Sequence, residues 1–158
     1  MNQQPEPHNL QQAFQTTVMI HGLMIIGVVS VAVVLIAVIG LPVTPDVSKL
    51  TVEWVGIAVA AINTIVCLTV FQKPMKSVVG QGMDGPPEAR YFAEWQITSL
   101  IRFALLEGAA LVNVIFSVFL GGGWLNLAPA LACLGVMMVL FPTRYGWESY
   151  LNERLGEP

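Results

Sequence analysis

Four long runs of apolar residues, separated by short polar segments, dominate the chain. They cover about residues 17–41, 52–71, 98–120 and 124–141. A helix needs about 20 apolar residues to cross a hydrocarbon core of about 30 Å, and each run is close to that length. The pattern therefore predicts an all-α protein, a four-helix transmembrane bundle whose membrane domain covers residues 17–142.

Turn-forming residues separate the runs. The segment LPVTPD, with its two prolines, ends the first helix, and Pro142 ends the fourth. Only Gly121, Gly122 and Gly123 join the third run to the fourth, so these two helices are expected to form an antiparallel hairpin. The first run is longer than the apolar core of a signal peptide and has no Lys or Arg before it, so it is expected to stay as a span.

The polar segments outside the runs are expected at the membrane surface or in water. Residues 1–16 form a polar tail, whose first twelve residues, MNQQPEPHNLQQ, are expected to be disordered. The segment EARYFAEWQI, residues 88–97, is expected to lie along the membrane as a short helix or to run straight into the third span. Residues 143–158 carry one apolar stripe, which predicts an amphipathic helix that lies on lipid or packs on its neighbours. The stripe comprises Trp147, Tyr150, Leu151 and Leu155.

Positive charges are distributed unevenly around the four runs. The side shared by both termini carries Lys73, Lys76, Arg90, Arg144 and Arg154, whereas the other side has only Lys49. Cytoplasmic segments of membrane proteins carry the excess of Lys and Arg. Both termini are therefore expected in the cytoplasm, in a multi-pass protein of a bacterial cytoplasmic membrane.

Composition agrees with a membrane protein. Hydrophobic residues make up 55% of the 158-residue chain and charged residues 11%, with a mean hydropathy of +0.69. A soluble domain carries roughly a quarter charged residues. The net charge of -3 argues against a nucleic-acid partner, so the expected partners are the lipid bilayer and either further copies of the chain or a membrane complex. Cys67 and Cys133 fall inside apolar runs and are expected to be small buried residues rather than a disulfide.

One acid lies deep inside the third run. Glu107 is about nine residues from the cytoplasmic end of that run, and Asn63 has a similar depth in the second run, which runs the opposite way. Gly27 and Cys133 fall in the same layer. An intramembrane acid is either a proton-binding or ion-relay group or, as a neutral acid, a hydrogen-bonded clasp between helices. Because no second ionisable group shares this depth, a clasp from Glu107 to Asn63 or to a neighbouring backbone is the favoured interpretation.

Two further polar residues lie nearer the cytoplasmic ends of their runs. Arg102 is roughly 140° around the helix from Glu107, so the two side chains are expected to point to different faces. Arg102 is expected to extend toward lipid headgroups, and His21 of the first run lies at the same shallow depth. The sequence has no CxxC, HExxH or paired-acid motif, so no catalytic residue, metal or cofactor is expected.

Small residues in the second run favour close helix packing. Gly56, Ala60 and Thr64 recur every four residues and form one ridge, which lets another helix approach within the chain or across subunits. Gly108, next to Glu107 in the third run, is a further candidate for a helix contact.

The stretch around Glu107 resembles known membrane proteins. Residues 104–111, ALLEGAAL, follow Arg102, and the last run ends Phe141-Pro142-Thr143; both features are similar to small four-span bacterial integral membrane proteins of unassigned function. The stretch is also faintly similar to the carboxylate helix of rotary-ATPase proteolipids, the c or K subunits, which carry one ion-binding acid in mid-span. This chain differs from proteolipids in its glycine-poor first run, its long middle link, and an acid in the third span rather than the last.

Two functions follow as expectations. The four runs take up most of the chain and carry no catalytic constellation, which favours a non-enzymatic integral membrane protein, a packing, assembly or accessory subunit of a membrane complex. The proteolipid resemblance and the depth of Glu107 support the alternative, proton or ion translocation through this acid.

Overall fold

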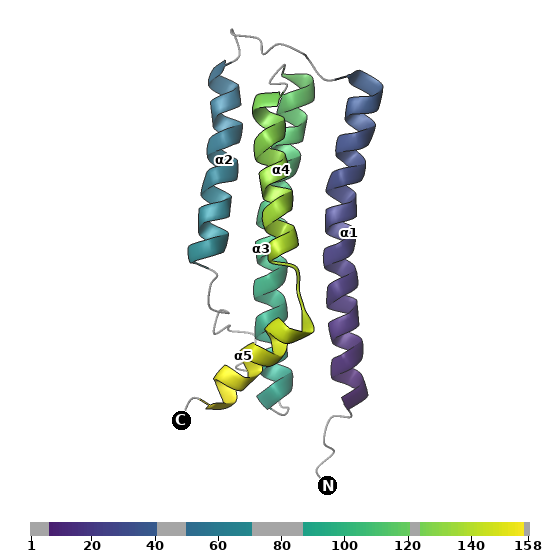
Figure 1. Ribbon diagram of the computed structural model, residues 1–158, viewed down its shortest axis with the longest axis vertical. Coiled ribbons are helices and arrows are strands. Elements are labelled where there is room, and N and C mark those ends of the chain that lie inside the picture. The colour runs from purple at the N-terminus through teal and green to yellow at the C-terminus, as the bar shows by residue number, and fades with distance from the viewer. Residues whose placement is uncertain (1–6, 41–49, 71–86, 121–123, 157–158) are drawn as a thin grey trace.

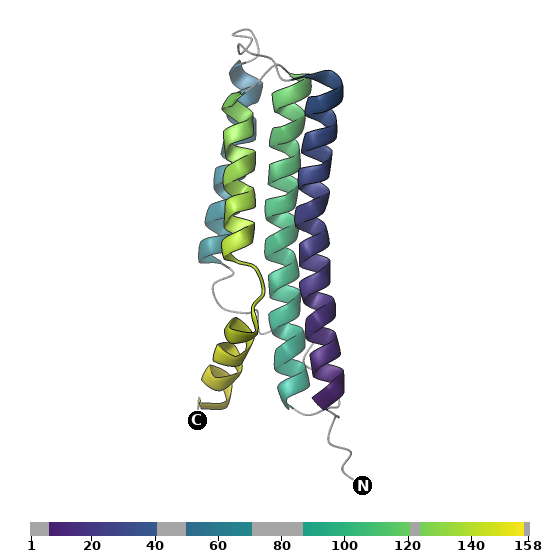
Figure 2. The ribbon, with the colours of Figure 1, turned by 45° about the vertical axis from the view of Figure 1, so that its right-hand side comes forward.

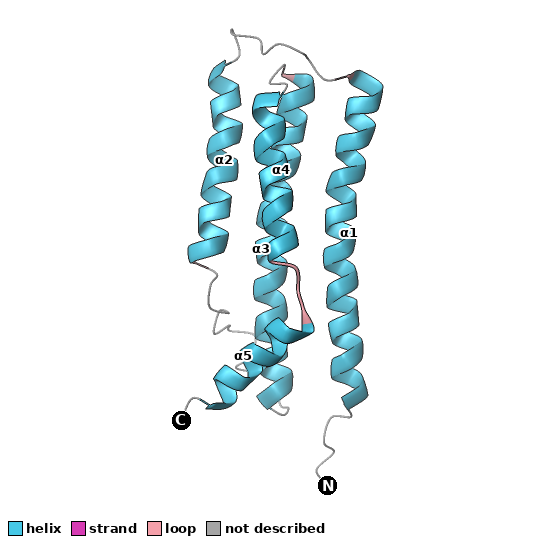
Figure 3. Cartoon of the chain, viewed as in Figure 1, coloured by secondary structure: helices cyan, strands magenta, loops and turns pink. Residues whose placement is uncertain are grey.

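Five α-helices make up the part of the chain that the structure describes. The computed structural model describes residues 7–40, 50–70, 87–120 and 124–156, without the side chains of residues 7–9, 50 and 52. The helices are α1 (Pro7–Ile39), α2 (Leu50–Thr69), α3 (Pro87–Phe119), α4 (Trp124–Val139) and α5 (Arg144–Gly156) (Figure 1). No strand occurs within these ranges, so the all-α prediction is confirmed for them (Figure 3).

Helices α1 to α4 lie side by side and run alternately in opposite directions, as Figures 1 and 2 show. The beginning of α1 and the whole of α5 lie at the same end of the bundle. Helix α3 is central, because α1, α2, α4 and α5 all pack against it. Helix α2 also packs on α4, whereas the main contacts of α1 are with α3 alone.

Two helices are long and apolar enough to cross a membrane. They are the part of α1 from Leu10 to Ile39 and the whole of α3. Helices α4 and α5 count as a third candidate if they form one span, bent by 61° where Pro142 interrupts the helix. The apolar stretch of α2, Glu53–Thr69, is shorter than these. The described residues thus confirm a helical chain with two or three candidate membrane spans.

Helices α1 and α3 both begin earlier than their apolar runs. Helix α1 includes residues 7–16 of the polar tail, so the expectation of disorder is wrong for residues 7–12. Phe14 stacks on Trp95 with 6.1 Å between ring centroids and Thr17 is fully buried, and these contacts hold the start of α1 on α3. Residues 88–97 form no separate surface helix and instead run straight into α3. No proline follows Pro87 in α3, so nothing breaks the helix before Phe119.

The carboxyl-terminal helix α5 packs on α3, which is one of the two arrangements that its apolar stripe allowed. Trp147 meets the rings of Phe92 and Trp95, at centroid distances of 5.1 and 5.7 Å, and Tyr150 is buried. Leu155, at the end of the stripe, is exposed. Aromatic packing at one end of the bundle therefore positions α5.

Small side chains bring α2, α3 and α4 together. The buried core contains Val28, Ala60, Cys67, Phe103, Leu106, Ala109, Ala110, Cys133 and Met137. Both cysteines are free and buried, as expected from the sequence.

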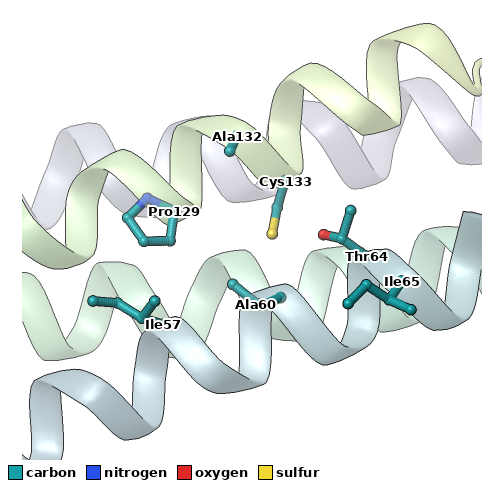
Figure 4. A pocket seen from close by; sticks show the side chains of 8 residues that line it. Ile57, Ala60, Thr64, Ile65, Pro129, Ala132 and Cys133 are labelled. Carbon is teal, nitrogen blue, oxygen red and sulfur yellow. The ribbon is translucent and has the colours of Figure 1, made fainter.

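A shallow apolar groove of about 310 Å³ remains between α2 and α4. In it the Thr64 hydroxyl and the Cys133 thiol point toward each other (Figure 4).

The two glycines expected at helix contacts have different surroundings. A Cβ added to Gly56 would lie 2.6 Å from Nδ2 of Asn126 and 2.9 Å from Oδ1 of Asn113, so α2 approaches its neighbours closely there. Gly108 is exposed, and a Cβ added to it would meet nothing within 4 Å in the part of the chain that the structure describes. The closeness of α2 to α3 and α4 therefore depends on Gly56 and not on Gly108.

This difference predicts opposite effects of the same substitution. Gly56→Ala forces a methyl group against two buried amides and should lower the free energy of unfolding by about 1–3 kcal/mol. Gly108→Ala adds a methyl group in open space and should be neutral or raise that free energy by up to about 1 kcal/mol, because alanine favours the helix. Reversible unfolding in mixed micelles measures both, and equal losses from the two variants would contradict the close contact at Gly56.

Candidate functional site

The carboxyl group of Glu107 lies between α3 and α1. A Cβ added to Gly27 of α1 would lie 3.9 Å from Oε1 of Glu107, and the Glu107 side chain is half-buried. The sequence placed both residues at one depth, and the structure brings them face to face. Because glycine has no side chain, α1 leaves room for the carboxyl group at this point.

Asn63 lies on a different side of α3. Its Nδ2 donates to the backbone carbonyl of Leu105 at 3.3 Å, and one turn away the Cys67 thiol donates to the carbonyl of Arg102 at 3.5 Å. The structure therefore joins Asn63 to the backbone of α3 rather than to the carboxyl group of Glu107. Leu105 and Glu107 are two positions apart on α3, so their directions differ by about 200° around the helix axis. The similar depth of Asn63 and Glu107 therefore did not mean that they lie on the same face of α3.

His21 is a fully buried residue with both ring nitrogens engaged. Nδ1 lies 2.7 Å from the carbonyl of Thr17, and Nε2 lies 2.9 Å from the Ser99 hydroxyl on α3. The ring also meets Phe103 edge-on, at 4.2 Å between centroids. A carbonyl oxygen can only accept, so Nδ1 is the donor to Thr17. His21 thus holds α1 against α3.

Arg102 lies near the layer of His21, but the structure shows no contact between the two in the ranges it describes. The Arg102 side chain is half-buried. Its Nε atom is buried and, within those ranges, has no hydrogen-bond partner. The expected extension of Arg102 toward lipid headgroups stays a prediction.

A network of buried amides joins three helices at the end of the bundle away from α5. Nδ2 of Asn113 on α3 donates to the carbonyls of Gly56 and Ala109, each at 2.9 Å. Nδ2 of Asn126 on α4 donates to Oδ1 of Asn113 at 3.1 Å and to the carbonyl of Glu53 at 3.2 Å. Both asparagine side chains are fully buried, so the network fixes α2 against α3 and α4.

Glu53 lies in the first turn of α2 and is buried beside this network, with 1% of its surface exposed. Sequence reasoning missed it, because an acid at the edge of an apolar run looks like a residue at the membrane surface. It also missed Asn113 and Asn126. Each of these two asparagines lies within an apolar run, where an amide without a hydrogen-bond partner is costly, and this could have marked them as paired residues. The sequence does not show which of these groups meet.

A second cluster of charges joins α5 to α3. Glu94 is 4% exposed, and its carboxylate lies 3.7 Å from Nε of Arg90 and 3.6 Å from Nη2 of Arg154. The Tyr150 hydroxyl donates to Glu94 at 3.4 Å and accepts from Nε of Arg154 at 3.0 Å. Burial raises the pKa of Tyr150 above its ordinary value, which keeps the hydroxyl protonated as a donor.

The acids Glu53, Glu107 and Glu94 thus lie in separate surroundings. No group of three His, Cys, Asp or Glu side chains that could hold a metal ion occurs among the described residues.

Comparison of the chain with protein-family models, curated proteins and solved structures gives no match. The resemblances read from residues 104–111 remain predictions. The chemistry available at these positions is the binding of a charge or of a polar partner.

The cluster around Glu94 predicts how α5 can be released. Arg154→Ala removes one of two cations beside a buried carboxylate and should lower the free energy of unfolding by about 1–3 kcal/mol. Arg144 forms an exposed pair with Glu148 at 2.8 Å in the same helix, so Arg144→Ala should change it by less than about 0.5 kcal/mol. Hydrogen exchange of residues 144–156 should accelerate in Arg154→Ala alone. Unchanged protection of α5 in that variant would show that the cluster does not hold it.

Proposed function

We propose that the chain is a four-span integral membrane protein of a bacterial cytoplasmic membrane, with both termini in the cytoplasm. The 20 residues of α2 rise about 30 Å, which matches the hydrocarbon core, and α1 and α3 are longer. The 16 residues of α4 rise about 24 Å, and the helix carries no charged residue. The alternating directions of the helices support termini on one side.

The surface of the bundle supports this placement. Large apolar side chains are exposed on all four long helices, among them Leu23, Val38, Ile65, Phe119, Leu131 and Val139. Soluble monomers seldom expose apolar patches of more than a few hundred square ångströms. Lipid tails would cover these side chains without cost, because tails and side chains are equally apolar.

Within the membrane, we propose that the protein is a non-enzymatic accessory or assembly subunit that contacts another membrane helix. The half-buried Glu107 is the observation that carries this function. A carboxyl group exposed to lipid tails costs several kcal/mol, even when neutral, unless it has a hydrogen-bond partner. A polar group on a partner helix would supply that bond, whether the partner is a second copy of the chain or another membrane protein.

The residues beside Glu107 suit a close approach of such a helix. Ala104 and Gly108 are exposed on α3, one helical turn apart, and form a small-residue ridge next to Glu107. Ridges of this kind let two helices in lipid pack with their backbones close together. We call Ala104, Glu107 and Gly108 the Glu107 face. Helix α1 leaves this face accessible, because Gly108 has open space around it.

A second function, proton or ion translocation, uses the same acid. Its support is that Glu107 is ionisable, half-buried and in the interior of the longest apolar stretch of α3. In proteoliposomes this function predicts a flux that Glu107→Gln abolishes, since glutamine cannot release a proton. The accessory function instead predicts no flux above that of empty vesicles.

Two matched glycines test the accessory function. Gly108 and Gly135 are both exposed with open space beside them, Gly108 on the Glu107 face and Gly135 on α4. Gly108→Leu should block the partner helix and reduce the native mass of the complex, purified in mild detergent, to that of one chain, whereas Gly135→Leu should leave it unchanged. Glu107→Leu should weaken the complex about 5- to 30-fold, as expected for loss of an interhelical hydrogen bond of about 1–2 kcal/mol.

Two results would contradict the accessory function. One is a wild-type protein that has the mass of a single chain in mild detergent and forms no cross-links in native membranes. The other is an equal loss of assembly in Gly108→Leu and Gly135→Leu, which would place the contact elsewhere or show a general effect of the added side chain. Melting curves of the two variants should coincide, because neither side chain enters the core.

A further inference from the structure

Three buried oxygens at the end of the bundle away from α5 lack a hydrogen-bond donor. They are Oε1 and Oε2 of Glu53 and Oδ1 of Asn126, none of which has a hydrogen-bond partner among the described residues. The two residues are 1% and 0% exposed. They are also directly joined, because Nδ2 of Asn126 donates to the backbone carbonyl of Glu53 at 3.2 Å.

The neighbouring donors are already used. An asparagine amide has two N–H hydrogens. Those of Asn113 go to the carbonyls of Gly56 and Ala109. Those of Asn126 go to Glu53 and to Oδ1 of Asn113. The network therefore has acceptors to spare and no free amide hydrogen to offer them.

Ser117 adds another oxygen but no donor. Its hydroxyl donates to the carbonyl of Val114 at 2.8 Å, and the side chain is fully buried. It lies one turn beyond Asn113 on α3, and α2 runs antiparallel to α3, with Gly56 bonded to Asn113. This register brings Ser117 to the level of Glu53, which is about one turn from Gly56 in the opposite direction.

Glu53 lies in the first turn of α2, where the aligned peptide dipoles point their positive end toward the side chain. A proton on Glu53 would provide a single donor and would leave one of the three oxygens without a partner. A bound cation could contact all three oxygens and would neutralise the charge.

We propose that Glu53 and Asn126 bind one monovalent alkali cation, with Na⁺ as the probe. Hard cations prefer carboxylate and amide oxygens, which are the groups present. The single negative charge matches a single positive charge. The ion would join α2 to α4 near the end of the bundle away from α5. This site is separate from Glu107 and does not depend on the accessory function.

The stability of the purified full-length chain in detergent tests the site. NaCl should raise the melting temperature of the wild type in a saturable way, relative to choline chloride at equal ionic strength, because a ligand that binds only the folded state stabilises it. Glu53→Gln keeps the shape without the charge and should lose the Na⁺-dependent shift. Glu148→Gln, at an exposed position of α5, should keep it.

If Glu53→Gln fails to fold, direct binding of ²²Na⁺ to the wild type still tests the site. Unlabelled NaCl should compete with the bound ²²Na⁺, and choline chloride should not. The proposal predicts saturable binding of about one ion per chain. It is overturned if Na⁺ and choline give equal melting temperatures and no ²²Na⁺ binds. It is also overturned if only acidification stabilises the wild type, which would make Glu53 a proton site, or if only Ca²⁺ binds.

Discussion

The hydrogen bonds of Asn113 are the interaction on which the arrangement of α2, α3 and α4 depends. In lipid there is little hydrophobic driving force between helices, so close packing and buried polar contacts decide how they meet. Asn113 binds the backbone of α2 at Gly56 and the side chain of Asn126 on α4. The bonds are possible because Gly56 has no Cβ, which would lie 2.6 Å from Nδ2 of Asn126. One glycine and two amides thus set the register of three helices.

The sequence predicted the helices well because their cause is local. Runs of apolar residues ended by Pro142 or by glycines specify where the helices lie and that they alternate in direction, although α1 and α3 begin before their runs. The rotation of each helix about its axis is different, since it depends on which side chains fit together across helices. Asn63 and Glu107 were expected at a similar depth, yet Asn63 binds the backbone of α3 and Glu107 faces Gly27. For the same reason the cluster of Glu53 with Asn126 could not be foreseen.

The three acids Glu53, Glu94 and Glu107 differ in the groups that surround them. Glu94 has Arg90 and Arg154 within 4 Å and serves to hold α5. Glu53 is as deeply buried but, within the described part of the chain, its carboxylate has no hydrogen-bond partner, which is why it carries the inference of a bound cation. Glu107 is half-buried on a face with small neighbours. A compensated acid needs no further explanation, whereas our proposals supply a partner helix for Glu107 and a cation for Glu53.

Helix α1 distinguishes this bundle from a closed four-helix core. It packs mainly on α3, through His21 and Phe14, whereas α2, α3 and α4 form a compact unit of small residues. The exposed apolar surface of α1 and the adjacent Glu107 face are therefore the surfaces most suited to lipid or to another membrane helix. Both uses require that the four long helices cross a bilayer.

Labelling of single cysteines with a membrane-impermeant thiol reagent tests that crossing most directly. Cysteines are placed one at a time in residues 1–6, 41–49, 71–86 and 121–123 of a chain carrying Cys67→Ala and Cys133→Ala. Four crossings with cytoplasmic termini predict labelling of intact cells at 41–49 and 121–123, and labelling at 1–6 and 71–86 only after the membrane is opened. Labelling of 121–123 only after opening, or of residues 1–6 in intact cells, would contradict the four-span arrangement.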